Sequence, residues 1–120
     1  MAKQILVVDD SASVRQVVSM TLKNAGHQVV EAVDGRDALN KLDSHRFNLV
    51  ISDVNMPNMD GISFIKEMKK KSDYRFTPVL MLTTESEASK KAEGKAAGAK
   101  AWLVKPFKPD VLLSAVSKLA

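Results

Sequence analysis

The stretch ISDVNMPNMDG, residues 51–61, places a carboxylate at the end of an apolar segment. The run Leu49–Ile51 is typical of a buried strand, and Asp53 follows it almost at once. A charge at the edge of a core is costly unless something pairs with it. Asp53 therefore either caps the next helix or takes part in chemistry.

Three other apolar segments also end in polar side chains. These are Asp9-Asp10 after residues 5–8, Thr83-Thr84 after residues 79–82, and Lys105-Pro106 after residues 101–104. Each feature alone is as well explained by a turn or a helix start. Their common position at the ends of apolar runs favours a shared site.

The elements that would position these residues alternate along the chain. Short apolar runs predict five buried parallel strands at Ile5–Val8, Gln28–Ala32, Leu49–Ser52, Val79–Leu82 and Ala101–Val104. Amphipathic segments between them predict five helices, the second capped by Asp34 and the third following Asp60. This alternation predicts an α/β fold, a doubly wound parallel sheet of strand order 2-1-3-4-5 with a flavodoxin-like arrangement. Ligands of such sheets bind beyond the carboxyl ends of the strands.

The fourth helix, residues 86–97, has a thin apolar face. We expect Ala88, Ala92 and Ala96 on its inner side, and Gly94 weakens it. Such a helix either shifts at low cost or packs close to the sheet.

Three carboxylates that meet in one crevice repel one another unless a cation lies among them. The sequence has no cysteine and no histidine near these positions, and oxygen donors suit Mg²⁺. An aspartate can attack phosphorus as a nucleophile, and the metal and a lysine would offset the charge that develops. Asp53 is thus a candidate phosphoryl acceptor, with Lys105 beside it.

The composition of the chain limits the class of protein, its location and its partners. The 120 residues fit a single domain, residues 1–120, and the chain shows neither a signal peptide nor a membrane span, so we expect a cytoplasmic monomer. The net charge of +4 comes from residues 86–120, where seven lysines face three acids. This excess is either a solvated surface or a docking surface for an acidic partner. Nucleic acid is not expected, because the Lys69–Lys71 run has acids close by.

The stretches ILVVDDS, DGRDALNKL, VISDVNMPNMDG, PVLMLTTE and AWLVKPF resemble receiver domains of two-component response regulators, and among these the CheY-type chemotaxis proteins. The strand order above is the one known for that type, so it is not a separate prediction. The resemblance implies that Asp9, Asp10, Asp53 and the backbone carbonyl of Asn55 bind Mg²⁺. It also implies that Asp53 is phosphorylated, that Thr83 and Lys105 contact the phosphoryl group, and that the Lys105-Pro106 bond is cis.

The resemblance further implies a switch formed by Thr83 and the aromatic residue three positions before Lys105. That residue is usually Tyr or Phe, and here it is the larger Trp102, which puts the usual inward rotation in doubt. Thr84 stands where CheY often has Ala. Asn55, Thr84 and Glu85 are the positions expected to tune the lifetime of the phosphoryl group.

We therefore expect a phosphoryl-accepting switch, rather than a turnover enzyme, that receives its phosphoryl group from a histidine kinase of the CheA type. Because no output domain follows the last helix, output would pass through a partner such as a flagellar motor switch protein. An alternative is a phosphate sink or phosphorelay intermediate that binds no motor. An aspartate-nucleophile phosphatase would need an acid at Asn55, and a flavin binder would need a phosphate loop in place of Asp9-Asp10.

Overall fold

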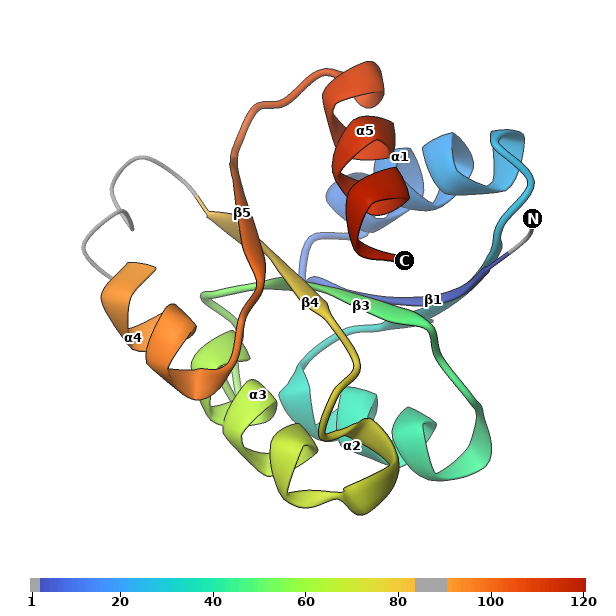
Figure 1. Cartoon of the computed structure of the whole chain (residues 1–120). Helices are drawn as coiled ribbons and strands as arrows, with labels where there is room; N and C mark the ends of the chain where they lie inside the picture. Colours follow the sequence, from blue (N-terminus) through green and yellow to red (C-terminus); the bar gives the residue numbers. More distant parts are fainter. Residues whose placement is uncertain (1–2, 84–90) are drawn as a thin grey trace.

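The computed structural model describes residues 3–83 and 91–120. Five strands form one parallel sheet in the order β2-β1-β3-β4-β5 (Figure 1). Their bounds are β1 Gln4–Val8, β2 Gln28–Ala32, β3 Leu49–Asp53, β4 Val79–Thr83 and β5 Ala101–Val104. The predicted strand ranges and strand order are confirmed, each strand end to within one residue.

Helices cover both faces of the sheet (Figure 1). On one face lie α1 (Ala12–Asn24) and α5 (Pro109–Leu119); on the other lie α2 (Gly35–Ser44), α3 (Gly61–Lys70) and α4 (Lys91–Ala97). A short 3₁₀ turn, η1 (Ser72–Tyr74), follows α3. Within the described residues, the helices are too short or too polar to cross a membrane.

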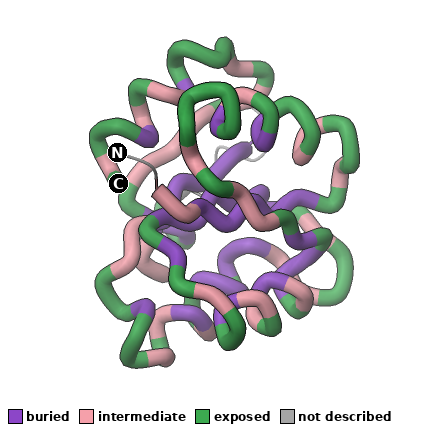
Figure 2. Tube along the Cα trace, turned by 90° about the vertical axis from the view of Figure 1, so that its right-hand side faces the viewer, coloured by how far each residue is buried: buried purple, intermediate pink, exposed green. Residues whose placement is uncertain are grey.

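The core forms two layers because side chains alternate across each strand. In β1, Ile5 and Val7 face α1 and α5, whereas Leu6 and Val8 face α2 and α3. Every residue of β3 and β4 is buried, so these two strands are the centre of the molecule. Figure 2 shows the buried residues concentrated along the strands and the exposed ones on outer helix surfaces and loops.

The helix caps show whether Asp53 caps the helix that follows it, which was one of its two possible roles. Oδ1 of Asp60 accepts a hydrogen bond from the Ser63 backbone N–H at 2.8 Å and so caps α3. Asp34 caps α2 in the same way, through the Asp37 N–H at 2.8 Å. Asp53 lies inside β3, seven residues before the cap of α3, and has no capping role there.

The predicted inner face of the fourth helix was wrong. Ala92 and Ala96 are exposed, whereas Gly94 is buried and Ala97 packs against the core. The physical reason is the indole of Trp102, which occupies the space beneath α4 and is closest to Gly94. Ala88 and the predicted start of this helix at residue 86 lie outside the described residues.

Candidate functional site

The topology brings the carboxylates of Asp9, Asp10 and Asp53 together. Strands β1 and β3 are neighbours, with Val8 opposite Ser52, so the residues that follow lie side by side. Each carboxylate offers an oxygen within 4.8 Å of the others. Asp9 is fully buried, Asp53 is 6% exposed, and Asp10 faces solvent.

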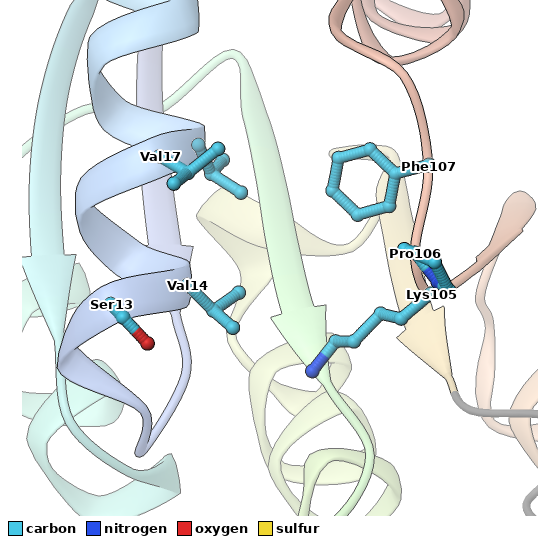
Figure 3. A pocket seen from close by; sticks show the side chains of 7 residues that line it. Ser13, Val14, Val17, Lys105, Pro106 and Phe107 are labelled. Carbon is cyan, nitrogen blue, oxygen red and sulfur yellow. The ribbon is translucent and has the colours of Figure 1, made fainter.

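Lys105 reaches this cluster from the end of β5. Its ammonium Nζ donates to Oδ2 of Asp9 at 3.1 Å and lies 3.2 Å from Oδ1 of Asp53. Figure 3 shows its nitrogen at the carboxyl end of β3. The lysine backbone N–H donates to the Thr83 carbonyl at 2.6 Å, and the Lys105-Pro106 bond is cis, in agreement with the prediction.

The surroundings of Asp53 disfavour its charge. Burial, and then the neighbouring charge of Asp9, raise the pKa of Asp53 from 3.8 to about 6, although Lys105 acts against this shift. Burial alone would lower the pKa of Lys105, but the carboxylates of Asp53 and Asp9 outweigh burial and raise it. The cluster therefore contains more negative charge than its own lysine neutralises.

This donor set fits a hard divalent cation. Mg²⁺ prefers oxygen ligands and is commonly held by one or two carboxylates plus phosphate oxygens. The three carboxylates converge from the loop after β1 and the last residue of β3, and the exposed Asp10 leaves one side of the cluster open to solvent. The residues present are thus suited to magnesium.

Thr83 supplies a hydroxyl whose bonding is incomplete. Asp53 is opposite Leu82 in the sheet register, so Thr83 is the next residue along β4. Its side chain is fully buried, and Oγ1 has no hydrogen-bond partner among residues 3–83 and 91–120. An unpaired buried hydroxyl costs about 1–3 kcal/mol.

The loop that carries Asn55 is tied to the start of α2. Asn58 has a left-handed backbone (φ 67°), and its side-chain amide donates to Oδ2 of Asp34 at 2.7 Å. The Gly35 N–H donates to the Met59 carbonyl at 3.2 Å in the same region. Sequence reasoning assigned Asp34 only a cap and Asn58 no role. The available signal was the asparagine itself, a residue that tolerates positive φ.

Two further residues around Asp9 and Asp53 were missed. The Arg15 guanidinium donates to the Asp9 backbone carbonyl at 2.6 Å and pairs with Glu31 at 3.3 Å, which fixes the end of β1. Gly61 lies against the backbone of Asp53, where a Cβ would overlap the carbonyl oxygen and lie 3.1 Å from the carbonyl carbon. Only glycine permits this approach.

The structure says less about the remaining predicted site residues. Asn55 is exposed at the start of the loop after β3, and Trp102 lies on β5, half-buried against the core that α3 and α4 cover. Thr84 and Glu85 lie outside the described residues.

An apolar groove of about 480 Å³ borders the cluster. Ser13, Val14, Val17 and Val18 of α1 form one wall, and Lys105, Pro106 and Phe107 form the other (Figure 3). Val17 of α1 is apolar, yet 58% of its surface is exposed.

Similarity to known proteins extends over nearly the whole length of the chain. Residues 5–117 match the model of the response regulator receiver domain. The chemotaxis response regulator CheY4 of Vibrio cholerae is 52% identical, superposes with a TM-score of 0.94, and each chain covers all of the other. Protein PilG of Pseudomonas aeruginosa is 35% identical over 113 residues, which are 94% of this chain and 84% of that protein.

A more distant solved structure is described with a metal in its own active-site cleft. The receiver domain of the sensor histidine kinase PA1611 of Pseudomonas aeruginosa, described with a magnesium ion coordinated in its active-site cleft, is 25% identical with a TM-score of 0.91 and coverage of 99% and 98%. Some curated relatives are longer: this chain spans 45% of a probable transcriptional regulator, ycf27, of Porphyridium aerugineum. The chain therefore belongs to the receiver domains of response regulators, and it is of the CheY type.

Proposed function

We propose that Asp53 accepts a phosphoryl group from a phosphohistidine of a histidine kinase, of the CheA type. The observation that carries this proposal is the buried Asp53 carboxylate, destabilised by Asp9 and contacted by the Lys105 ammonium at 3.2 Å. Its magnesium would be held by Asp9, Asp10, Asp53 and the backbone carbonyl of Asn55. When bound, magnesium would offset the charge of the phosphoryl oxygens.

The side chains of the chain itself have distinct parts in the transfer. A carboxylate oxygen of Asp53 forms the new P–O bond while the P–N bond to the donor histidine breaks, and that electron pair returns to the imidazole nitrogen. The Lys105 ammonium would contact a phosphoryl oxygen, and the Thr83 hydroxyl, which has no partner among the described residues, would donate to another. Asn55, Thr84 and Glu85 would set how fast water removes the group.

We further propose that the phosphorylated chain works as a chemotaxis-type switch, as a single receiver domain of residues 1–120 in the cytoplasm. It would be a monomer that binds a flagellar motor switch protein or another output protein, without substrate turnover. The likeness to the chemotaxis regulator of Vibrio cholerae supports this reading. The exposed lysines Lys95, Lys100, Lys108 and Lys118 give the surface of α4, β5 and α5 a positive charge suited to an acidic partner.

Acetyl phosphate with Mg²⁺, followed by intact-mass spectrometry, tests the acceptor. The wild type gains one phosphoryl group, and Asp53→Asn gains none because an amide cannot attack phosphorus. Asp73→Asn, which removes an exposed carboxylate from the opposite end of the molecule, is labelled like the wild type. Undiminished labelling of Asp53→Asn would sink the assignment.

Output is tested by measuring binding of the phosphorylated and unphosphorylated chain to a purified flagellar motor switch protein. A motor-type switch binds more tightly when phosphorylated. Equal or absent binding, with normal phosphotransfer from the kinase, favours the phosphate sink or phosphorelay alternative. Steady hydrolysis of a phosphate monoester would instead revive the phosphatase alternative.

A further inference from the structure

The indole of Trp102 lies beneath α4 rather than at the surface of β5. Trp102 is opposite Met81 in the register of β4 and β5, and its side chain packs against the core layer that includes Ala97 and Ala99. Its Nε1 is buried and has no hydrogen-bond partner in the part of the chain that the structure describes. The ring is therefore held by packing, without a polar anchor among those residues.

Gly94 is the position of α4 that faces this ring. A Cβ built on Gly94 would overlap Cη2 of the indole and lie 3.0 Å from Cζ3 and 3.5 Å from Cζ2. The neighbouring residues of the helix, Glu93 and Lys95, are exposed, whereas Gly94 is buried. Any other residue type at position 94 would push the indole or the helix away.

A glycine is an unfavourable choice in the middle of this seven-residue helix. Its presence is explained if the ring needs the space, because an indole gains much from being covered by apolar surface. Gly94 thus trades helix propensity for contact with Trp102. From the sequence alone, Gly94 was predicted only to weaken the helix.

We propose that Gly94 is a positioning residue for Trp102: it forms a seat that holds the indole inward, beneath α4, before any phosphoryl group is present. The seat itself depends only on packing. Its consequence rests on the proposed function: Thr83 would not signal by drawing the aromatic ring inward, since the ring is already there. The signal would instead pass through a shift of α4 relative to the seated ring.

Gly94→Ala tests the seat, because Trp102 is the only tryptophan and its fluorescence reports on this contact alone. We expect a red-shifted emission, a larger acrylamide quenching constant and a lower Tm, since the added methyl displaces the ring. A glycine that only weakens the helix gives the opposite result. In that case Gly94→Ala raises the Tm and leaves emission and quenching unchanged, which overturns the proposal.

Two further variants separate ring contact from helix propensity. In a Trp102→Phe background the smaller ring leaves room for the methyl, so Gly94→Ala there should raise the Tm, reversing the sign seen with Trp102. The same rise in both backgrounds would contradict the seat. Ala96→Gly, at an exposed position of the same helix, should lower the Tm without moving the emission maximum.

A phosphoryl mimic, beryllofluoride with Mg²⁺, tests the consequence for switching. Its binding is followed separately by calorimetry. In the wild type, the bound mimic should not reduce acrylamide quenching, because the indole is already inward. A clear fall in quenching on binding would show a ring that enters only on activation and would overturn the proposal. If calorimetry shows no binding, the proposed function fails, while the seat is still decided by the Gly94 variants.

Discussion

At the scale of single residues, the Asp53 carboxyl combines reactivity with a cost to the fold. Its pKa is raised to about 6 because it is buried beside Asp9, so the folded protein holds this proton more tightly than the unfolded chain does. Stability from this group is complete below pH 3.8 and declines as the pH rises through 3.8 to about 6. Above that range the folded state bears the full penalty, roughly 3 kcal/mol by the size of the shift.

Asp53→Asn should therefore stabilise the magnesium-free protein in a pH-dependent way. In EDTA the variant should melt higher than the wild type at pH 7–8, because it lacks the buried charge. The difference should shrink towards pH 4, where the wild-type carboxyl is protonated in the folded state and about half protonated in the unfolded state, whose pKa is 3.8. Thermal melts of both proteins across this range check the prediction. A difference that is constant with pH would show that another effect of the substitution dominates.

Most of the site residues were predictable one at a time, because each follows an apolar run that is clearly a strand. Asp9, Asp53 and Lys105 meet as expected since parallel strands bring their carboxyl ends to one edge. The contact between Arg15 and the fully buried Asp9 was not predictable from the sequence. That contact joins a guanidinium to a backbone carbonyl, which carries no sequence pattern.

At the scale of elements, the loop between β3 and α3 determines where Asn55 lies. Two described hydrogen bonds tie it to the start of α2: one from the Asn58 amide to Asp34 at 2.7 Å, and one from the Gly35 N–H to the Met59 carbonyl at 3.2 Å. Hydrogen bonds from the Asp37 backbone and the Asn58 side chain lower the pKa of Asp34. The loop is thereby held at the start of a neighbouring helix.

Asn58→Gly should weaken Mg²⁺ binding while keeping the backbone conformation, since glycine adopts positive φ readily. We expect a several-fold rise in the magnesium Kd measured by calorimetry, because the loop keeps only the Gly35–Met59 hydrogen bond and holds the Asn55 carbonyl less firmly. Ser63→Ala, in the first turn of α3 and outside this tie, is the control and should bind magnesium normally. An unchanged Kd for Asn58→Gly would show that the loop holds its shape without Asp34.

The groove between α1 and the segment after β5 offers a route for a phosphodonor protein. Val17 is 58% exposed on one wall, across the groove from Lys105 and Phe107. Val17→Glu should slow phosphotransfer from the kinase by about tenfold, the equivalent of roughly 1.4 kcal/mol of lost contact. Phosphorylation by acetyl phosphate, which needs no protein contact, should keep its rate. Equal slowing with both donors would place the effect in the site itself.

Elements were predicted well where a continuous run of apolar residues is buried. They were predicted poorly where a single side-chain contact sets the orientation of the element. Strands β3 and β4 are buried along their whole length, so their apolar runs mark them almost to the residue. Helix α4 has no such run. Its orientation follows from the position of one indole, which no periodicity of alanines could reveal.

At the scale of the whole molecule, the acidic cluster and the lysine beside it come from segments that are far apart in the sequence. Lys105 contacts Asp9, 96 residues away along the chain, as well as Asp53. Without a metal, the repulsion among the three carboxylates therefore acts between β1 and β3, in the centre of the sheet. A ligand that relieves it should stabilise the entire fold.

Magnesium should raise the Tm of the wild type, because a ligand that binds only the folded state stabilises it by mass action. At a hundred times its Kd this amounts to about 2.7 kcal/mol, and each kcal/mol moves the Tm of a domain of this size by several degrees.

Asp10→Ala should melt higher than the wild type in EDTA, since one repelling charge is gone, yet respond far less to magnesium. Asp73→Ala removes an exposed carboxylate that pairs loosely with Arg46 at 3.7 Å, and it should keep the full magnesium response. Differential scanning calorimetry with and without millimolar Mg²⁺ compares the three proteins directly. If the wild-type Tm does not respond to magnesium, the three carboxylates do not form a metal site. If Asp10→Ala keeps the full response, Asp10 is not one of its ligands.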